Sequence, residues 1–266
     1  MPAGIERHGL FSATCPDGIV GRSVPVGWRS VGFVHWAYDP STVARLLPPG
    51  VSVDLYGGRA WAGLQFTTVI PGRSHGSGAS PLDRLPWRPR LRPQFDEVRA
   101  VVAVVDRHNR PGVWYLSLDT NRRIVAAGLR RWLNLPAYEA ESRFSSVDGR
   151  FEYWTHRPDG TTARLKLTVG PTITPTDIDR FLTARWRIVL PPPFWDGPDE
   201  SRTMPIFHEP WILHRASVEF VDDELLVAAG LPPATGPGQA LWSPGTTVDI
   251  GLGFELGRRL ATMEGC

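Results

Sequence analysis

The sequence is nearly devoid of lysine: of its 29 cationic side chains only Lys166 is a lysine, and the others are arginines. Arginine stays protonated in proteins and supplies no nucleophilic amine, so imine chemistry on a ketone has one candidate residue in the chain. Residues 162–169 alternate apolar and polar side chains with the period of a strand, which predicts that Lys166 faces solvent. Covalent catalysis through a lysine is therefore disfavoured.

Cysteine is scarce and histidine is scattered. The two cysteines, Cys15 and Cys266, form no CxxC or Cys/His cluster, so we expect free thiols in a cytoplasmic protein rather than a disulfide framework. The seven histidines show no His-x-His or HExxH pattern, and the sequence has no glycine-rich phosphate loop. We therefore predict no metal site and no cofactor.

Long apolar runs and a large charge excess are also absent. A membrane-spanning helix takes roughly 20 apolar residues, and the sequence contains no such run and no apolar signal-peptide segment at its start. The formal net charge is +2, without the clustering of basic residues that nucleic-acid-binding proteins show. We expect no membrane and no nucleic-acid partner.

The composition is that of a compact folded protein. With 266 residues, 42% of them hydrophobic, the chain can bury a large core as one β-rich unit or as two small ones. We predict a single domain over residues 1–266 with an N-terminal extension at 1–26. One compositional break occurs at residues 71–93, which are dense in Pro, Gly, Ser and Arg. Two interpretations stay open: a long surface loop that covers a pocket, or a disordered segment.

Hydrophobic periodicity predicts more strands than helices. Apolar runs, period-two patterns and turn residues predict strands in two hairpins, at 99–106 with 113–118 and at 151–156 with 162–169. Helical spacing and capping residues predict short helices at 40–47, 121–133 and 176–183. The pattern favours a β-rich α+β fold.

Several short motifs follow one another along the chain. They read Phe-Val-His-Trp at 33–36, Gly-Arg-Ala-Trp at 58–61, Pro-Gly-Val-Trp at 111–114, Ser-Leu-Asp at 117–119 and His-Glu-Pro-Trp at 208–211. Together they resemble the uncharacterised YqjF-like family, a branch of the acetoacetate decarboxylase-like superfamily. The resemblance covers most of the chain and implies a bent antiparallel sheet or barrel that encloses a pocket. It also implies a homo-oligomer, although no residue of this sequence specifies one.

The same resemblance shows what the chain lacks. Residues 126–139 resemble the decarboxylase segment in which a Pro-Lys-Lys-Leu sequence supplies the Schiff-base lysine. Here Pro136 is followed by Ala137 and Tyr138, and neither side chain can form an imine with a ketone. We therefore expect the fold without the Schiff-base mechanism.

Three residues are predicted to be catalytic. Glu97 matches a catalytic-site glutamate of the decarboxylases, and a carboxylate beside an apolar run is desolvated in a way that suits acid/base work. The resemblance places Arg29 near the substrate carboxylate and Tyr138 in the neighbourhood of the missing lysine. Each has a structural alternative: an ion pair for Glu97, a surface position for Arg29 and a space-filling ring for Tyr138.

The binding residues are predicted from aromatic and polar motifs. Indole rings suit an apolar or polyketide-like ligand, and neighbouring residues on a strand face opposite sides, so at most one of His208 and Glu209 enters a pocket. Core packing is the alternative for the indoles, and it is the preferred interpretation of both His208 and His35. The predicted binding residues are His208, Glu209, Trp211, Trp36 and Trp114.

Two functional hypotheses remain. In the first, the protein is an enzyme that acts on a small carbonyl or polyketide-like compound by non-covalent acid/base catalysis, with Glu97 as acid or base. Enolisation, dehydration, cyclisation and decarboxylation all fit this equipment. In the second, the protein binds a hydrophobic ligand without catalysis, and pairing of Glu97 with a structural arginine would favour this alternative.

Overall fold

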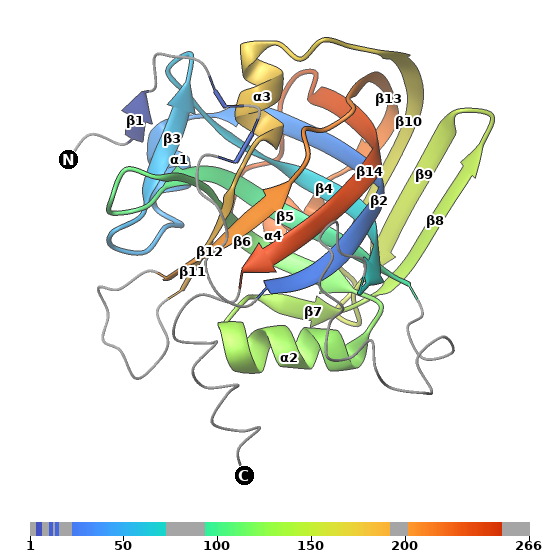
Figure 1. Ribbon diagram of the computed structural model, residues 1–266, viewed down its shortest axis with the longest axis horizontal. Helices are drawn as coiled ribbons and strands as arrows, with labels where there is room; N and C mark the ends of the chain where they lie inside the picture. The colour runs from blue at the N-terminus through green and yellow to red at the C-terminus, as the bar shows by residue number, and fades with distance from the viewer. Residues whose placement is uncertain are drawn as a thin grey trace.

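The computed structural model describes residues 4–6, 11–12, 14–15, 23–72, 94–191 and 202–251. Its main feature is a ring of hydrogen-bonded strands that closes on itself (Figure 1). The ring runs β2–β4–β5–β6–β11–β12–β14 and returns to β2, with only β6 and β11 paired in parallel. These strands are β2 (Ser23–Tyr38), β4 (Arg59–Pro71), β5 (Phe95–Val105), β6 (Pro111–Thr120), β11 (Arg187–Leu190), β12 (Arg202–His208) and β14 (Gln239–Gly251).

A second layer extends from β14 and packs on the outside of the ring. Its strands are β13 (His214–Asp222), β10 (Thr162–Thr172), β9 (Arg150–His156) and β8 (Glu141–Val147), in that order. Three short strands flank the ring: β1 (Gly4–Glu6), β3 (Ser52–Tyr56) and β7 (Ala137–Glu139). The helices are α1 (Pro40–Ala44), α2 (Arg123–Leu133), α3 (Asp177–Thr183) and α4 (Glu224–Ala228). The predicted β-rich α+β architecture is confirmed.

Successive residues of the ring strands point alternately outward and inward, into two different hydrophobic cores. On the outer face, Leu64 of β4 packs in one cluster with Leu165 of the second layer. On the inner face, Val101 of β5 belongs to a second cluster that fills the ring. Helices lie at both ends of the ring (Figure 1): α2 contributes Ala126 to the inner cluster, and α3 packs Phe181 against the far end of β5. The interior of the ring is therefore enclosed.

Local sequence signals account for the predicted elements. The β5–β6 hairpin turns at Asp106, whose carboxylate accepts hydrogen bonds at 2.9 Å from the backbone N–H groups of His108 and Arg110. The predicted helix at 176–183 begins with a capping box, in which Thr176 and Asp179 satisfy each other's backbone N–H groups. Both hairpins and all three helices are confirmed, with boundaries shifted by a few residues.

The structure describes part of the predicted N-terminal extension and part of the predicted loop. Residues 23–26 of the predicted N-terminal extension belong to β2, and residues 4–6 pair with β3. Of the predicted loop at 71–93, residues 73–93 lie outside the described residues. Within the described ranges, none of the helices has the length and apolar character needed to cross a bilayer.

Candidate functional site

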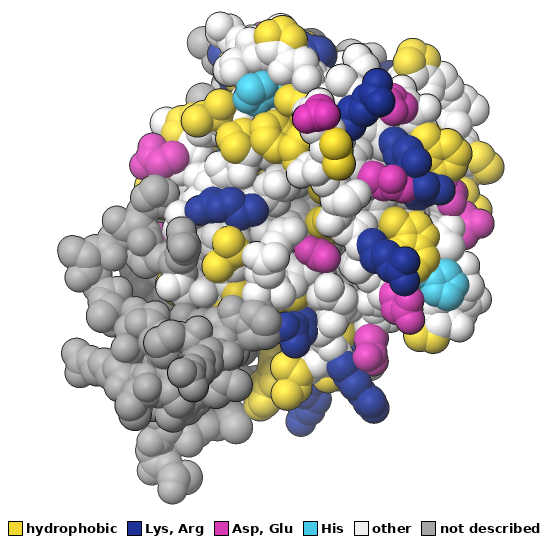
Figure 2. Space-filling model, turned by 90° about the vertical axis from the view of Figure 1, so that its right-hand side faces the viewer, with side chains coloured by type: hydrophobic (Ala, Val, Ile, Leu, Met, Phe, Trp, Pro, Cys, Tyr) yellow, Lys and Arg dark blue, Asp and Glu magenta, His cyan; other side chains and the backbone are white. Residues whose placement is uncertain are grey.

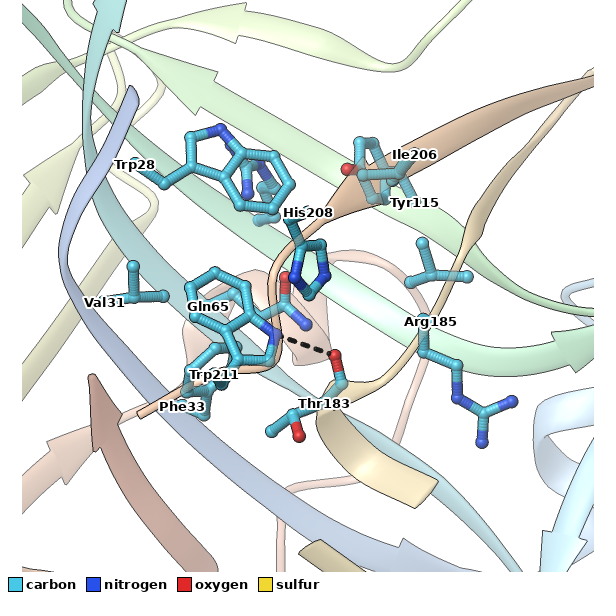
Figure 3. Close-up of a pocket in the computed structure, with 12 residues that line it drawn as sticks. Trp28, Val31, Phe33, Gln65, Tyr115, Thr183, Arg185, Ile206, His208 and Trp211 are labelled. Carbon is cyan, nitrogen blue, oxygen red and sulfur yellow. Dashed lines mark hydrogen bonds between the residues drawn. The ribbon is translucent and has the colours of Figure 1, made fainter. Parts of the chain in front are cut away.

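The inner core of the ring contains a small cavity (Figure 3). Its volume is about 20 Å³, room for about one or two water molecules. Strands β2, β4, β5, β6 and β12 contribute to its wall, together with the end of α3 and the segments that follow α3 and β12. The lining residues are Trp28, Val31, Phe33, Gln65, Arg99, Val113, Tyr115, Thr183, Arg185, Ile206, His208 and Trp211.

One wall of the cavity is aromatic. The rings of Trp28 and Trp211 stack with their centroids 6.0 Å apart and an interplanar angle of 6°, and Phe33 meets Trp211 edge-on at 5.5 Å. The indole N–H of Trp211 donates a hydrogen bond of 3.1 Å to the carbonyl oxygen of Thr183 (Figure 3). This bond ties the segment after β12 to the end of α3, so Trp211 closes the cavity on that side.

Arg99 lines the cavity next to Trp28 and belongs to a buried ion pair with Glu97. The Arg99 guanidinium donates two hydrogen bonds to Oε2 of Glu97, one of them from Nε at 3.0 Å, and both side chains are buried. The same guanidinium lies 4.5 Å from the centre of the Trp28 ring, in a cation–π contact. Tyr115 faces this pair, and burial raises the pKa of its phenol, so it remains a hydrogen-bond donor at neutral pH. The wall thus offers two donors to a bound oxygen atom.

His208 supplies a neutral imidazole at the end of β12. Burial lowers its pKa to about 4, and its Nδ1 lies 2.6 Å from the carbonyl oxygen of Glu209. A carbonyl oxygen only accepts, so Nδ1 carries the proton and Nε2 is left as an acceptor. The ring is held between Trp186 and Trp211, with centroid distances of 4.5 and 4.7 Å. His208 is therefore equipped to accept a proton or a hydrogen bond.

Arg185 adds a second guanidinium, which is also paired. Its Nη1 donates to Oδ2 of buried Asp54 at 2.5 Å, and its Nε donates to the carbonyl oxygen of Phe181 at 2.6 Å. In Figure 3 the guanidinium of Arg185 points away from His208. Each of the two cationic side chains in the wall therefore has a carboxylate partner.

The structure brings together only part of the predicted site. His208 and Trp211 both line the cavity. Glu97 lies one cross-strand row behind it and reaches it through Arg99, which is the ion-pair alternative considered from the sequence. Glu209, the first residue after β12, is exposed.

The other four predicted side chains lie away from this cavity. Arg29 follows Trp28 on β2, so it faces the opposite side of the sheet, and its Nη1 donates to the Trp28 carbonyl oxygen at 3.1 Å. Trp36 and Trp114 pack in the outer core, because each occupies the outward phase of its strand. Tyr138 is 40% exposed on β7, and its ring covers the guanidinium of Arg157 at 3.7 Å.

A comparison with known protein families identifies the family of this chain. A family model for DUF2071, described as an uncharacterized conserved protein, matches residues 26–247. The chain belongs to the DUF2071 family. It is also 25% identical over 232 residues to the uncharacterized protein YqjF of Bacillus subtilis strain 168, a match that covers 85% of this chain and 88% of YqjF.

Solved structures share the fold of this DUF2071 protein. An acetoacetate decarboxylase-like enzyme from Sphingomonas wittichii RW1 superposes with a TM-score of 0.56 at 16% identity, covering 89% of this chain and 94% of that one. The enduracididine biosynthesis enzyme MppR, complexed with pyruvate, gives 0.56 at 18% identity, with 91% and 96% covered. Acetoacetate decarboxylase from Legionella pneumophila gives 0.51 at 15% identity, with 88% and 89% covered. These similarities establish the acetoacetate decarboxylase-like fold.

The one lysine of this DUF2071 protein lies outside the cavity. Lys166 is on β10, on the opposite phase to the buried Leu165 and Leu167, and its Nζ lies 3.4 Å from Oε2 of Glu152. The face shown in Figure 2 carries basic and acidic side chains interspersed with one another. The Lys166 side chain is 36% exposed and paired with Glu152, so it faces solvent as its strand pattern predicts.

Sequence reasoning missed several cavity residues. A period-two signal could have identified Arg99, since it stands two residues from Glu97 on one strand and so faces the same side. No local pattern marks Trp28, Tyr115 or Arg185, because strand pairing and the packing of α3 bring them together. Among the residues that the structure describes, no group of histidine, cysteine or acidic side chains has the geometry of a metal site.

Proposed function

We propose that the protein is an enzyme that acts on a small carbonyl compound by non-covalent acid/base catalysis in this cavity. The observation that carries the proposal is the buried Glu97–Arg99 pair, whose Arg99 lines the same cavity as Tyr115 and His208. Convergent polar groups in a largely apolar enclosure are the usual setting for such chemistry.

The proposed roles follow from what each group can donate or accept. Arg99 and Tyr115 hold the carbonyl oxygen and stabilise the negative charge that develops on it during enolisation. Glu97 orients Arg99 and balances its charge from behind the cavity wall, while the acceptor Nε2 of His208, which lines the cavity, takes the proton. Enolisation, dehydration, cyclisation and decarboxylation of a carbonyl compound would all use this arrangement.

A non-catalytic function is the second candidate. Both hydrogen bonds from Arg99 go to Oε2 of Glu97, and the remaining wall is mostly aromatic and aliphatic. Such a site would hold a hydrophobic ligand without reacting with it. The two candidates differ in whether a bound compound is chemically changed.

The deciding experiment screens β-keto acids and polyketide-like ketones by native mass spectrometry and thermal shift. Wild type is compared with Glu97→Gln, which keeps the shape and an acceptor for Arg99 but removes the charge. For an enzyme we expect wild type to convert a ligand that the variant only binds, with turnover reduced about 10²–10⁴-fold. Glu141→Gln, an exposed residue of β8, is the matched control. Equal, unreactive binding by all three proteins would leave the binding function instead.

A further inference from the structure

We propose that a second, inner chamber built around His35 is a hydrogen-bonding subsite for an uncharged carbonyl or hydroxyl group of the ligand. The inference rests on the proposed function only in taking the adjoining cavity as the ligand site. The chamber shares Gln65, Val113 and Arg185 with that cavity and lies beside it. Its volume is about 10 Å³, which accommodates about one water molecule or one small polar group.

The strand register and a glycine position the His35 ring. His35 on β2 pairs with Gly63 on β4, which in turn pairs with Val101 on β5, so the three residues form one row across the inner wall. A Cβ on Gly63 would lie 2.4 Å from Cδ2 of His35 and 2.3 Å from the carbonyl oxygen of Val34. Only glycine leaves room for the ring at this position, and the ring therefore packs directly against the β4 backbone.

His35 is buried with a hydrogen-bonding atom unused. The residue is 3% exposed, and its Nδ1 has no hydrogen-bond partner among the described residues. Leaving a buried polar group unsatisfied costs about 1–3 kcal/mol, so such groups are rare and each one calls for a partner. His35 lines the chamber, which has room for one small polar group beside the ring.

The charge state of the chamber favours an uncharged group. Burial, with a smaller contribution from Arg185, lowers the pKa of His35 to about 3, so the imidazole is neutral at physiological pH and offers one donor and one acceptor. The guanidinium groups of Arg99 and Arg185 already pair with Glu97 and Asp54. A ligand carboxylate would have to compete with these partners, whereas a hydroxyl or carbonyl group would bond to His35 without competition.

A matched pair of small ketones tests the subsite by binding alone. 4-Hydroxybutan-2-one and pentan-2-one have nearly the same shape and differ by a hydroxyl in place of a methyl group. Measured by calorimetry, we expect wild type to prefer the hydroxyketone by about tenfold or more, since a buried polar group rejects an analogue that leaves it unpaired. His35→Leu should lose the preference yet still bind pentan-2-one, while His35→Gln, which keeps a donor and an acceptor, should retain it.

Several results would overturn the subsite. These are a failure of wild type to bind either probe, equal binding of both, or a preference that survives in His35→Leu. A large fall in the melting temperature of His35→Leu would instead assign His35 a structural role, because removal of an unsatisfied polar group should leave stability level or raised. His108→Leu, in the exposed β5–β6 turn, is the control. If His35→Leu loses the preference and wild type converts neither probe, the subsite is supported. Only the proposed catalysis is then contradicted.

Discussion

Glu97 and Arg99 illustrate how two neighbouring side chains on one strand can depend on each other. Both are buried on the inner face of β5, where a charge without a partner is strongly disfavoured. The pair therefore holds each member in place, and Arg99 in turn supports the Trp28 ring in the cavity wall. At the scale of single residues, the groups to which we assign the proposed function also stabilise the fold.

Removing one member of this ion pair should lower the free energy of unfolding more than removing both. We expect Arg99→Met to lower the free energy of unfolding by about 3–5 kcal/mol, because it leaves the Glu97 carboxylate buried and unpaired. The double variant Glu97→Leu/Arg99→Met should recover much of that loss. Urea unfolding of the two variants and of wild type measures the difference. A double variant as unstable as Arg99→Met would show that the loss arises from packing of the guanidinium rather than from the unpaired charge.

At the scale of elements, the meeting of β2 and β14 positions the aromatic wall. Gly245 on β14 pairs with Arg29 on β2, next to a bulge at which Ser30 adopts a φ of 50°. Gly245 itself has a φ of 110°, and a Cβ there would lie 1.9 Å from the carbonyl oxygen of Trp28. The close approach of the two backbones at this point sets where the Trp28 ring enters the cavity.

Gly245→Ala should therefore damage both the fold and the site. A positive φ alone costs about 1–3 kcal/mol for a side-chain-bearing residue, and the contact with the Trp28 backbone adds to this. Gly236→Ala is the matched control, since Gly236 has a φ of 77° but nothing within 4 Å of its added Cβ. Thermal unfolding should show the larger loss for Gly245→Ala. Equal losses in the two variants would mean that β2 and β14 separate without penalty and that the close approach is unimportant.

At the scale of the whole molecule, the closed ring excludes water from histidines that would otherwise titrate near neutral pH. Burial lowers the pKa of His35 to about 3 and that of His208 to about 4, from an ordinary value of 6.5. The unfolded chain therefore binds more protons than the folded protein once the pH falls below 6.5. Stability rises with pH under this condition, so acid should favour unfolding.

We expect the free energy of unfolding to fall as the pH is lowered from about 6.5 toward 4. Each buried neutral histidine contributes a slope of up to about 1.4 kcal/mol per pH unit in this window. His35→Leu should reduce the slope by the contribution of one buried histidine. His108→Leu should leave the slope unchanged, because His108 is exposed. Urea unfolding at several pH values gives the slopes. The same slope in His35→Leu as in wild type would mean that His35 is protonated or solvated in the folded protein.

Much of the architecture could be predicted because its signals are local. The hairpin of β5 and β6 follows from two β-forming runs around a turn at Asp106, and α3 follows from the capping pair of Thr176 and Asp179. Short strands such as β11 and β7 were not predicted, because their pairing with β6 depends on contacts far along the chain. Strand pairing between distant segments leaves no pattern within either segment alone.

The sequence by itself determined the hairpins, the helix caps, the family and the near absence of an amine nucleophile, all of which depend on residue type and spacing. The membership of the cavity was decided only by the tertiary structure. Ring closure turned Trp28 and Tyr115 inward and left Trp36 and Trp114 in the outer core, since a shift of one residue along a strand reverses the face. Burial also requires Glu97 and Arg99 to pair with each other, and it keeps the His35 imidazole neutral. The Nδ1 atom of His35 has no hydrogen-bond partner among the described residues. Register and desolvation are properties of the assembled sheet, and the order of residues alone does not specify them.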